Sequence, residues 1–110
     1  MKIAITSTGN AFTSKLDQRF GRCSWFVFFD TESQGAEFLP NPFKDAEEGS
    51  GASSISLLTE RKVKKIISGE FGIKVKPLLD SHQIQMIILK DCERTIQEII
   101  DLLNHKKTEK

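Results

Sequence analysis

The sequence predicts a single α/β domain built on a five-stranded mixed sheet with helices on its faces. The chain has 110 residues, of which 38% are hydrophobic and 28% charged, and this suits one domain with one core. Short apolar segments bounded by turn residues are typical of strands. In the second half of the chain such segments alternate with helical patterns, and these crossovers imply parallel pairing.

The first part of the chain predicts three strands. Lys2–Ser7 alternates apolar and polar side chains and is broken by a glycine-containing turn. Trp25–Asp30 is the most apolar run, and a short run of this kind indicates a strand covered on both faces, at the centre of the core. Residues 31–35 make a hairpin-length connection to a third strand over 36–39. Pro40 then ends that strand, which suits an edge position.

The second part predicts two crossover units and a final helix. The expected elements are a helix over 52–61, a strand over Val63–Ser68, a short helix over 73–81, a strand over 84–89 and a helix over 92–104. Pro77 places the regular part of the short helix near Lys76, and Asp91 is the expected N-cap of the last helix. The element order is therefore β-β-β-α-β-α-β-α. The predicted strand order is third, second, first, fourth, fifth, with the second strand antiparallel. The domain spans 1–105, followed by a frayed polar tail over 106–110.

Bulk composition excludes several classes of function. A formal net charge of +1 does not indicate the strongly basic surface that binds nucleic acids. No apolar run approaches the roughly 20 residues of a membrane span, and no secretory leader follows Met1. Two cysteines do not make a disulfide framework, so the expected location is the cytoplasm. The expected oligomeric state is a monomer or a weak homodimer.

The carboxyl ends of the parallel strands predict where a ligand binds. The segments that follow these strands are 8–10, 69–72 and 90–92. The second strand is reversed, so the end of the long loop 11–22 meets them at the same edge, and loops of about 12 residues are uncommon unless functional. The candidate binding residues are Arg19, Phe20, Gly21, Arg22, Cys23, Gly69, Glu70, Phe71, Gly72 and Cys92.

Each of these candidates also has a purely structural interpretation. Arg19 and Arg22 could clamp an anion or simply be solvated. The turn around Gly69 could receive an anion on its backbone N–H groups or serve only as a turn. Cys92 at the expected helix start would favour the thiolate and could bind a soft metal, and Cys23 is the other metal-ligand candidate. In the predicted strand order the axes of the second and fifth strands are three spacings, roughly 14 Å, apart, and both cysteines could be structural.

These motifs, in this order, resemble the dinitrogenase iron–molybdenum cofactor-binding family of small domains with a ribonuclease H-like fold. The matching residues are Asp17-Gln18-Arg19-Phe20-Gly21-Arg22, Phe26-Val27-Phe28-Phe29-Asp30, Asn41-Pro42, Gly49-Ser50-Gly51-Ala52 and Ile67-Ser68-Gly69-Glu70-Phe71-Gly72. The resemblance implies a non-enzymatic module that binds or carries an iron–sulfur or iron–molybdenum cluster, or assists its assembly beside metallocluster assembly proteins. Relatives in nitrogenase cofactor assembly have histidine where Arg19 stands, and arginine, which stays protonated, is no ordinary metal ligand.

Two other functions compete with this interpretation. One is an orphan protein-interaction domain that lost cofactor binding when arginine replaced the histidine. The other is a nuclease, because the fold type hosts many. Two-metal nucleases need carboxylates on the central strands, and neither Lys2–Ser7 nor Val63–Ser68 contains one, which disfavours the nuclease.

Overall fold

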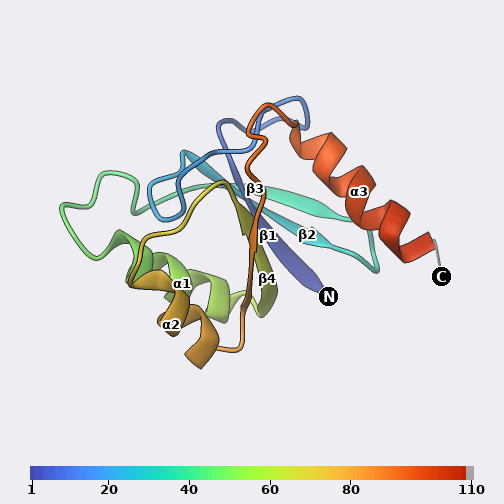
Figure 1. Cartoon of the computed structure of the whole chain (residues 1–110). Helices are drawn as coiled ribbons and strands as arrows, with labels where there is room; N and C mark the ends of the chain where they lie inside the picture. Colours follow the sequence, from blue (N-terminus) through green and yellow to red (C-terminus); the bar gives the residue numbers. More distant parts are fainter. Residues whose placement is uncertain (109–110) are drawn as a thin grey trace.

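The computed structural model describes residues 1–108 and confirms the predicted element order and sheet (Figure 1). The elements are β1 (Lys2–Ser7), β2 (Trp25–Asp30), β3 (Ala36–Pro40), α1 (Ser50–Glu60), β4 (Val63–Ser68), α2 (Val75–Ser81), β5 (Gln85–Ile88) and α3 (Ile96–Thr108). The strand order is β3-β2-β1-β4-β5. β2 runs antiparallel to β1 and β3, whereas β1, β4 and β5 are parallel.

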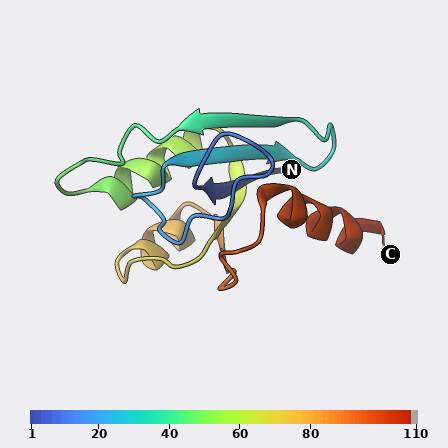
Figure 2. The ribbon, with the colours of Figure 1, turned by 90° about the horizontal axis from the view of Figure 1, so that it is seen from above.

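The sheet separates two hydrophobic clusters because side chains alternate along its strands. On β2, Phe26 and Phe28 pack with α1 and α2, whereas Val27 and Phe29 pack with α3. Figures 1 and 2 show α1 and α2 together, away from α3. All four β2 side chains are buried. The prediction of a strand covered on both faces is therefore confirmed.

The predicted start of the last helix is wrong. Asp91 caps no helix, and its side chain instead accepts a hydrogen bond from the Glu93 N–H in a turn. α3 begins at Ile96 because Thr95 and Glu98 form a capping box. The Glu98 N–H donates to Thr95 Oγ1 at 3.1 Å, and the Thr95 N–H donates to Glu98 Oε1 at 2.8 Å. Cys92 therefore lies in the loop before the helix.

Other element ends differ by one or two residues, except that α3 continues to Thr108. α1 starts earlier than predicted, at Ser50, after Gly49 in the left-handed conformation. The prediction of a frayed tail falls partly on residues 109–110, which lie outside the described part of the chain. Within residues 1–108, no helix is long and apolar enough to cross a membrane.

Candidate functional site

The loop between β1 and β2 pairs with the segment that follows β4. The Glu70 N–H donates to the Gln18 carbonyl at 2.7 Å, and the Phe20 N–H donates to the Glu70 carbonyl at 3.3 Å. Beneath them, the Thr6 hydroxyl donates to the Asp17 carbonyl at 2.7 Å. These bonds prolong the sheet beyond its strands, so the loop lies at the carboxyl edge of β1 and β4.

The Asp17 carboxylate holds this loop in shape. Its Oδ1 accepts the Arg19 N–H at 3.0 Å, and its Oδ2 accepts the Ser24 N–H at 3.2 Å. The side chain is 6% exposed, and a carboxylate this buried needs such partners. Asp17 is therefore an internal brace of the loop.

The earlier half of the same loop closes the N-terminus of α3. The Ile96 N–H donates to the Ser14 carbonyl at 2.8 Å, and the Gln97 N–H donates to the Phe12 carbonyl at 3.0 Å. Backbone N–H groups in the first turn of a helix lack partners within the helix. Here the loop supplies partners for these two groups.

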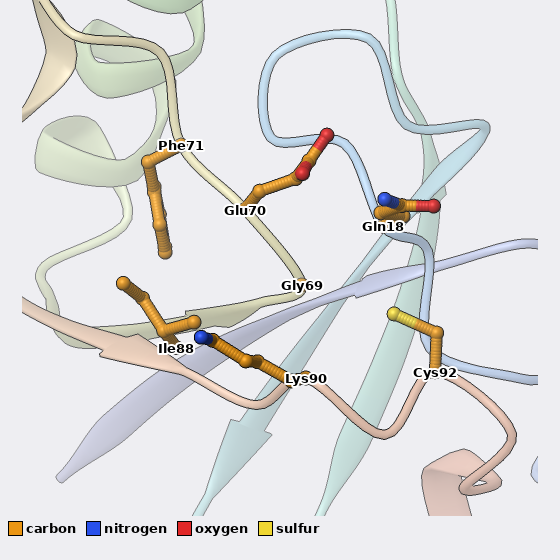
Figure 3. Close-up of a pocket in the computed structure, with 7 residues that line it drawn as sticks. All are labelled: Gln18, Gly69, Glu70, Phe71, Ile88, Lys90 and Cys92. Atoms are coloured by element: carbon orange, nitrogen blue, oxygen red, sulfur yellow. The ribbon is translucent and has the colours of Figure 1, made fainter.

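A cavity of about 420 Å³ opens at this edge of the sheet, between the loop, the segment after β4 and the end of β5. Its apolar side is formed by Phe71 and Ile88, which face each other in Figure 3. The sulfur of Cys92 points toward Gly69 and the backbone of Gln18. The lining residues are Gln18, Gly69, Glu70, Phe71, Ile88, Lys90 and Cys92.

A second hollow of about 410 Å³ shares Gln18 and Cys92 with the first. It is lined by Thr8, Lys15, Leu16, Asp17, Gln18, Arg19, Ser24, Cys92 and Glu93. At its rim Lys15 Nζ lies 2.6 Å from Glu93 Oε1, and this hydrogen bond raises the pKa of Lys15. Cys92 therefore borders two hollows that are lined by both basic and acidic side chains.

The sequence candidates divide between this site and the scaffold. Gly69, Glu70, Phe71 and Cys92 line the first hollow, and Arg19 lines the second.

The other candidates belong to the scaffold. Phe20 is buried and packs on Phe71, with ring centroids 5.3 Å apart. Arg22 points elsewhere, since its guanidinium donates to the main-chain carbonyls of residues 44, 46 and 47. Gly21, with φ of 88°, lies against Gly51, and Gly72 borders a different groove.

Cys23 belongs to the core cluster that packs with α1 and α2. It is fully buried, and burial raises the pKa of its thiol to about 12. Its carbonyl accepts a hydrogen bond from the Asn41 side-chain amide at 3.0 Å. Neither hollow includes Cys23 among its lining residues, so the structure does not bring the two cysteines to one site.

The expected low pKa of Cys92 is wrong. Partial burial raises the pKa of this thiol, and the carboxylates of Asp17, Asp91 and Glu70 add to the effect. No helix begins at Cys92, so the helix-dipole argument for a thiolate does not apply. A metal centre that bonds to this sulfur would have to displace the thiol proton.

Alkylation with iodoacetamide is expected to be faster at Cys92 than at Cys23, because Cys92 is half-buried and Cys23 is fully buried. Since the pKa of Cys92 is raised, its rate should keep increasing as the pH rises past the ordinary thiol value of about 8.5. Cys23→Ala and Cys92→Ala variants, followed by mass spectrometry, separate the two rates. Faster labelling at Cys23 in the folded protein would contradict this assignment.

The candidate list from the sequence did not contain Gln18, Ile88, Lys15 or Lys90, which line the two hollows. Gln18 belongs to the loop motif, but the sequence does not show that its carbonyl accepts a hydrogen bond from the Glu70 N–H, which places it at the site. Ile88 is 48% exposed at the end of β5, and a strand pattern alone predicts it to be buried. Lys90 lies in the segment 90–92 that the carboxyl-edge rule predicts to be at the site, although it was not among the candidate residues.

No three histidine, cysteine, aspartate or glutamate side chains converge as a metal site within the described residues. Among the residues that line the two hollows, Cys92 supplies the one soft donor, its sulfur. A bare metal ion generally needs three or four protein ligands. The described residues therefore do not by themselves complete a site for a bare metal ion.

The fold and this edge site define a small α/β domain with a loop-built cavity at the carboxyl ends of its parallel strands. The chain belongs to the dinitrogenase iron–molybdenum cofactor family, whose model matches residues 1–106. It is 29% identical to an uncharacterised protein of Methanocaldococcus jannaschii, over all of this chain and 91% of that protein.

Solved structures show the same fold. The apo form of the orange protein from Desulfovibrio gigas superposes with a TM-score of 0.84 at 23% identity, covering 96% of this chain and 88% of that one. A putative NifB protein from Thermotoga gives a TM-score of 0.79 at 28% identity, covering 94% and 87%. The first likeness, at its level of identity, concerns the fold alone.

Proposed function

We propose that this protein is a non-enzymatic carrier of a preassembled anionic iron–sulfur or iron–molybdenum cluster, acting beside the proteins that assemble it. The observation that supports this function best is the position of Cys92 between two hollows at the carboxyl edge of the sheet. Membership of the iron–molybdenum cofactor family supports the class of cargo. Two free cysteines also suit a reducing compartment such as the cytoplasm.

The charges around Cys92 favour weak and reversible binding. Lys15 is paired with Glu93, and Arg19 Nε lies 3.5 Å from Asp17 Oδ1. Lys90 has no ion pair in the part of the chain that the structure describes, so it is the cation most available to an anion. Binding through exposed charges is screened by salt. A carrier must release its cargo, and weak binding serves that purpose.

The cargo-binding test is an anaerobic titration of the protein with an iron–molybdenum–sulfur cluster, followed by absorption spectroscopy at low and high salt. Wild-type binding is expected to be weak and to weaken further with salt. Cys92→Ala should lower the affinity about tenfold or more, because it removes the one soft donor and a metal–thiolate bond exceeds the roughly 1.4 kcal/mol that this factor represents. Cys23→Ala is the matched control and should leave binding unchanged.

Arg19→His extends the same titration. Histidine offers a neutral nitrogen to a metal, whereas arginine offers only donors. The variant should bind the cluster more tightly, and only above the imidazole pKa of about 6.5, since protonation removes the lone pair. The proposal would be contradicted if the wild type bound the cluster tightly and neither salt nor the Cys92→Ala substitution lowered this affinity. If no form binds, the chain is instead a protein-interaction domain that kept the fold without the cofactor.

A further inference from the structure

A second surface lies at the start of α1 and α2. It is a mainly apolar groove of about 500 Å³ lined by Gly49, Ser50, Gly51, Ala52, Gly72, Ile73, Lys74, Val75 and Leu78. Ile73 is 96% exposed and Leu78 is 37% exposed. An apolar patch rimmed by charged residues marks an interaction surface on many proteins.

The groove is built from small residues that leave room for an incoming side chain. Gly49 precedes α1 with φ of 77° and has open space around its Cα. Deeper in, a Cβ on Gly51 would lie 3.1 Å from Val75 Cγ2, so the two helix starts already touch there. The close approach of Gly51 and Val75 fixes the bottom of the groove, whereas the Ile73 side chain is exposed to solvent.

Two charged segments flank the groove, an acidic wall that leads into Gly49 on the α1 side and a basic wall at Lys74 on the α2 side. The acidic residues Asp45, Glu47 and Glu48 lead into α1 and are exposed. The basic wall consists of Lys74, which lines the groove, and the nearby Lys76, whose Nζ contacts Asp80 Oδ2 at 2.9 Å. Neither Lys74 nor Glu48 has an ion pair among the described residues. Both ribbon views show the loop before α1 and the turn before α2 projecting at the same end of the molecule (Figures 1 and 2).

The segment that carries the acidic wall is anchored by hydrogen bonds to its backbone. The Arg22 guanidinium donates to the carbonyls of Lys44, Ala46 and Glu47. The Asn41 side chain accepts the Phe43 N–H at 2.9 Å and donates to the Gly21 carbonyl at 2.9 Å. The carboxylates of Asp45 and Glu47 lie within this anchored segment and that of Glu48 directly follows it, which reduces the entropic cost of using them in an interface.

We propose that this groove binds a second copy of the same chain about a two-fold axis. An apolar centre between one acidic and one basic wall is self-complementary, because a two-fold rotation about an axis along the groove places each acidic wall on the partner's basic wall. In this arrangement Lys74 of each copy faces Glu48 of the other, and Ile73 enters the opposite groove. A partner whose surface carries only one sign of charge would place that charge opposite a wall of the same sign.

The test is sedimentation velocity over a range of about 10 μM to 1 mM protein, where a small interface of this kind is expected to populate a dimer. Ile73→Ser should raise the dissociation constant about tenfold or more without lowering the melting temperature, since the side chain is 96% exposed. Leu102→Ser is the control. Leu102 is 43% exposed on α3, away from the groove, and its replacement should leave association unchanged.

A charge swap tests the two-fold arrangement directly. K74E and E48K should each be monomeric alone, because each places like charges opposite one another twice. An equimolar mixture should associate again, because every facing pair is then of opposite sign. Three results would each overturn the proposal: a wild type that stays monomeric at 1 mM, a dimer that survives Ile73→Ser, or a mixture that fails to associate.

Discussion

Replacing Phe26 with alanine is expected to lower the free energy of unfolding by about 3–5 kcal/mol, the usual cost of deleting a fully buried aromatic ring. Phe26 has no exposed surface. Its ring lies between those of Phe20 and Phe28, with centroids 6.3 Å and 6.1 Å away. The variant therefore leaves a cavity that rigid aromatic neighbours cannot fill.

Urea denaturation measures this loss, with an unchanged m-value showing that the folded and unfolded states keep their compactness. Phe12→Ala is the matched control, because Phe12 is 44% exposed although it contacts Phe38 edge-to-face at 5.3 Å. We expect it to cost about 1 kcal/mol or less. If Phe26→Ala does not fold, Phe26→Leu should fold at a smaller cost. A loss for Phe26→Ala no larger than the control's would mean that β2 is not the centre of the core.

Most of the fold could be predicted because its signals are local. β1, β2 and β4 begin and end at the predicted residues, since each is an apolar segment stopped by a polar or glycine-containing turn. The first residue of α3 was harder to predict, because two residues could cap the helix. Asp91 and Thr95 are both good N-cap residues, and only Thr95 has a glutamate three positions later to complete the capping box.

The site was harder to predict than the fold. The rule that parallel strands end at one edge brought Gly69 and Cys92 to the same region in advance, and both line the first hollow. The direction of each side chain depends on distant residues and is not encoded locally. Arg22 turns away because the carbonyls of the segment before α1 accept its hydrogen bonds. Phe20 turns inward because Phe26 and Phe71 surround it.

Gly69→Ala is expected to lower the free energy of unfolding by about 1–3 kcal/mol, the typical cost of overpacking a well-packed site. A Cβ at this position would lie 2.7 Å from Cys92 Sγ and 2.8 Å from Gln18 Cα. The second contact is with backbone. Gln18 cannot retreat without breaking its 2.7 Å hydrogen bond to the Glu70 N–H. The substitution should therefore separate the loop from the segment after β4 and open the candidate site.

Two further variants separate the causes of that loss. Gly72→Ala is the matched control, because the nearest atom to its Cβ, Val75 Cγ2, is 3.8 Å away. It should be neutral or slightly stabilising through a smaller unfolded-state entropy. Cys92→Ala combined with Gly69→Ala removes the sulfur contact and keeps the backbone contact, so it should recover only part of the stability. Full recovery would show that Gly69 makes room for the thiol alone. Equal stability of Gly69→Ala and Gly72→Ala would refute the close approach of Gln18 on which the geometry of both hollows depends.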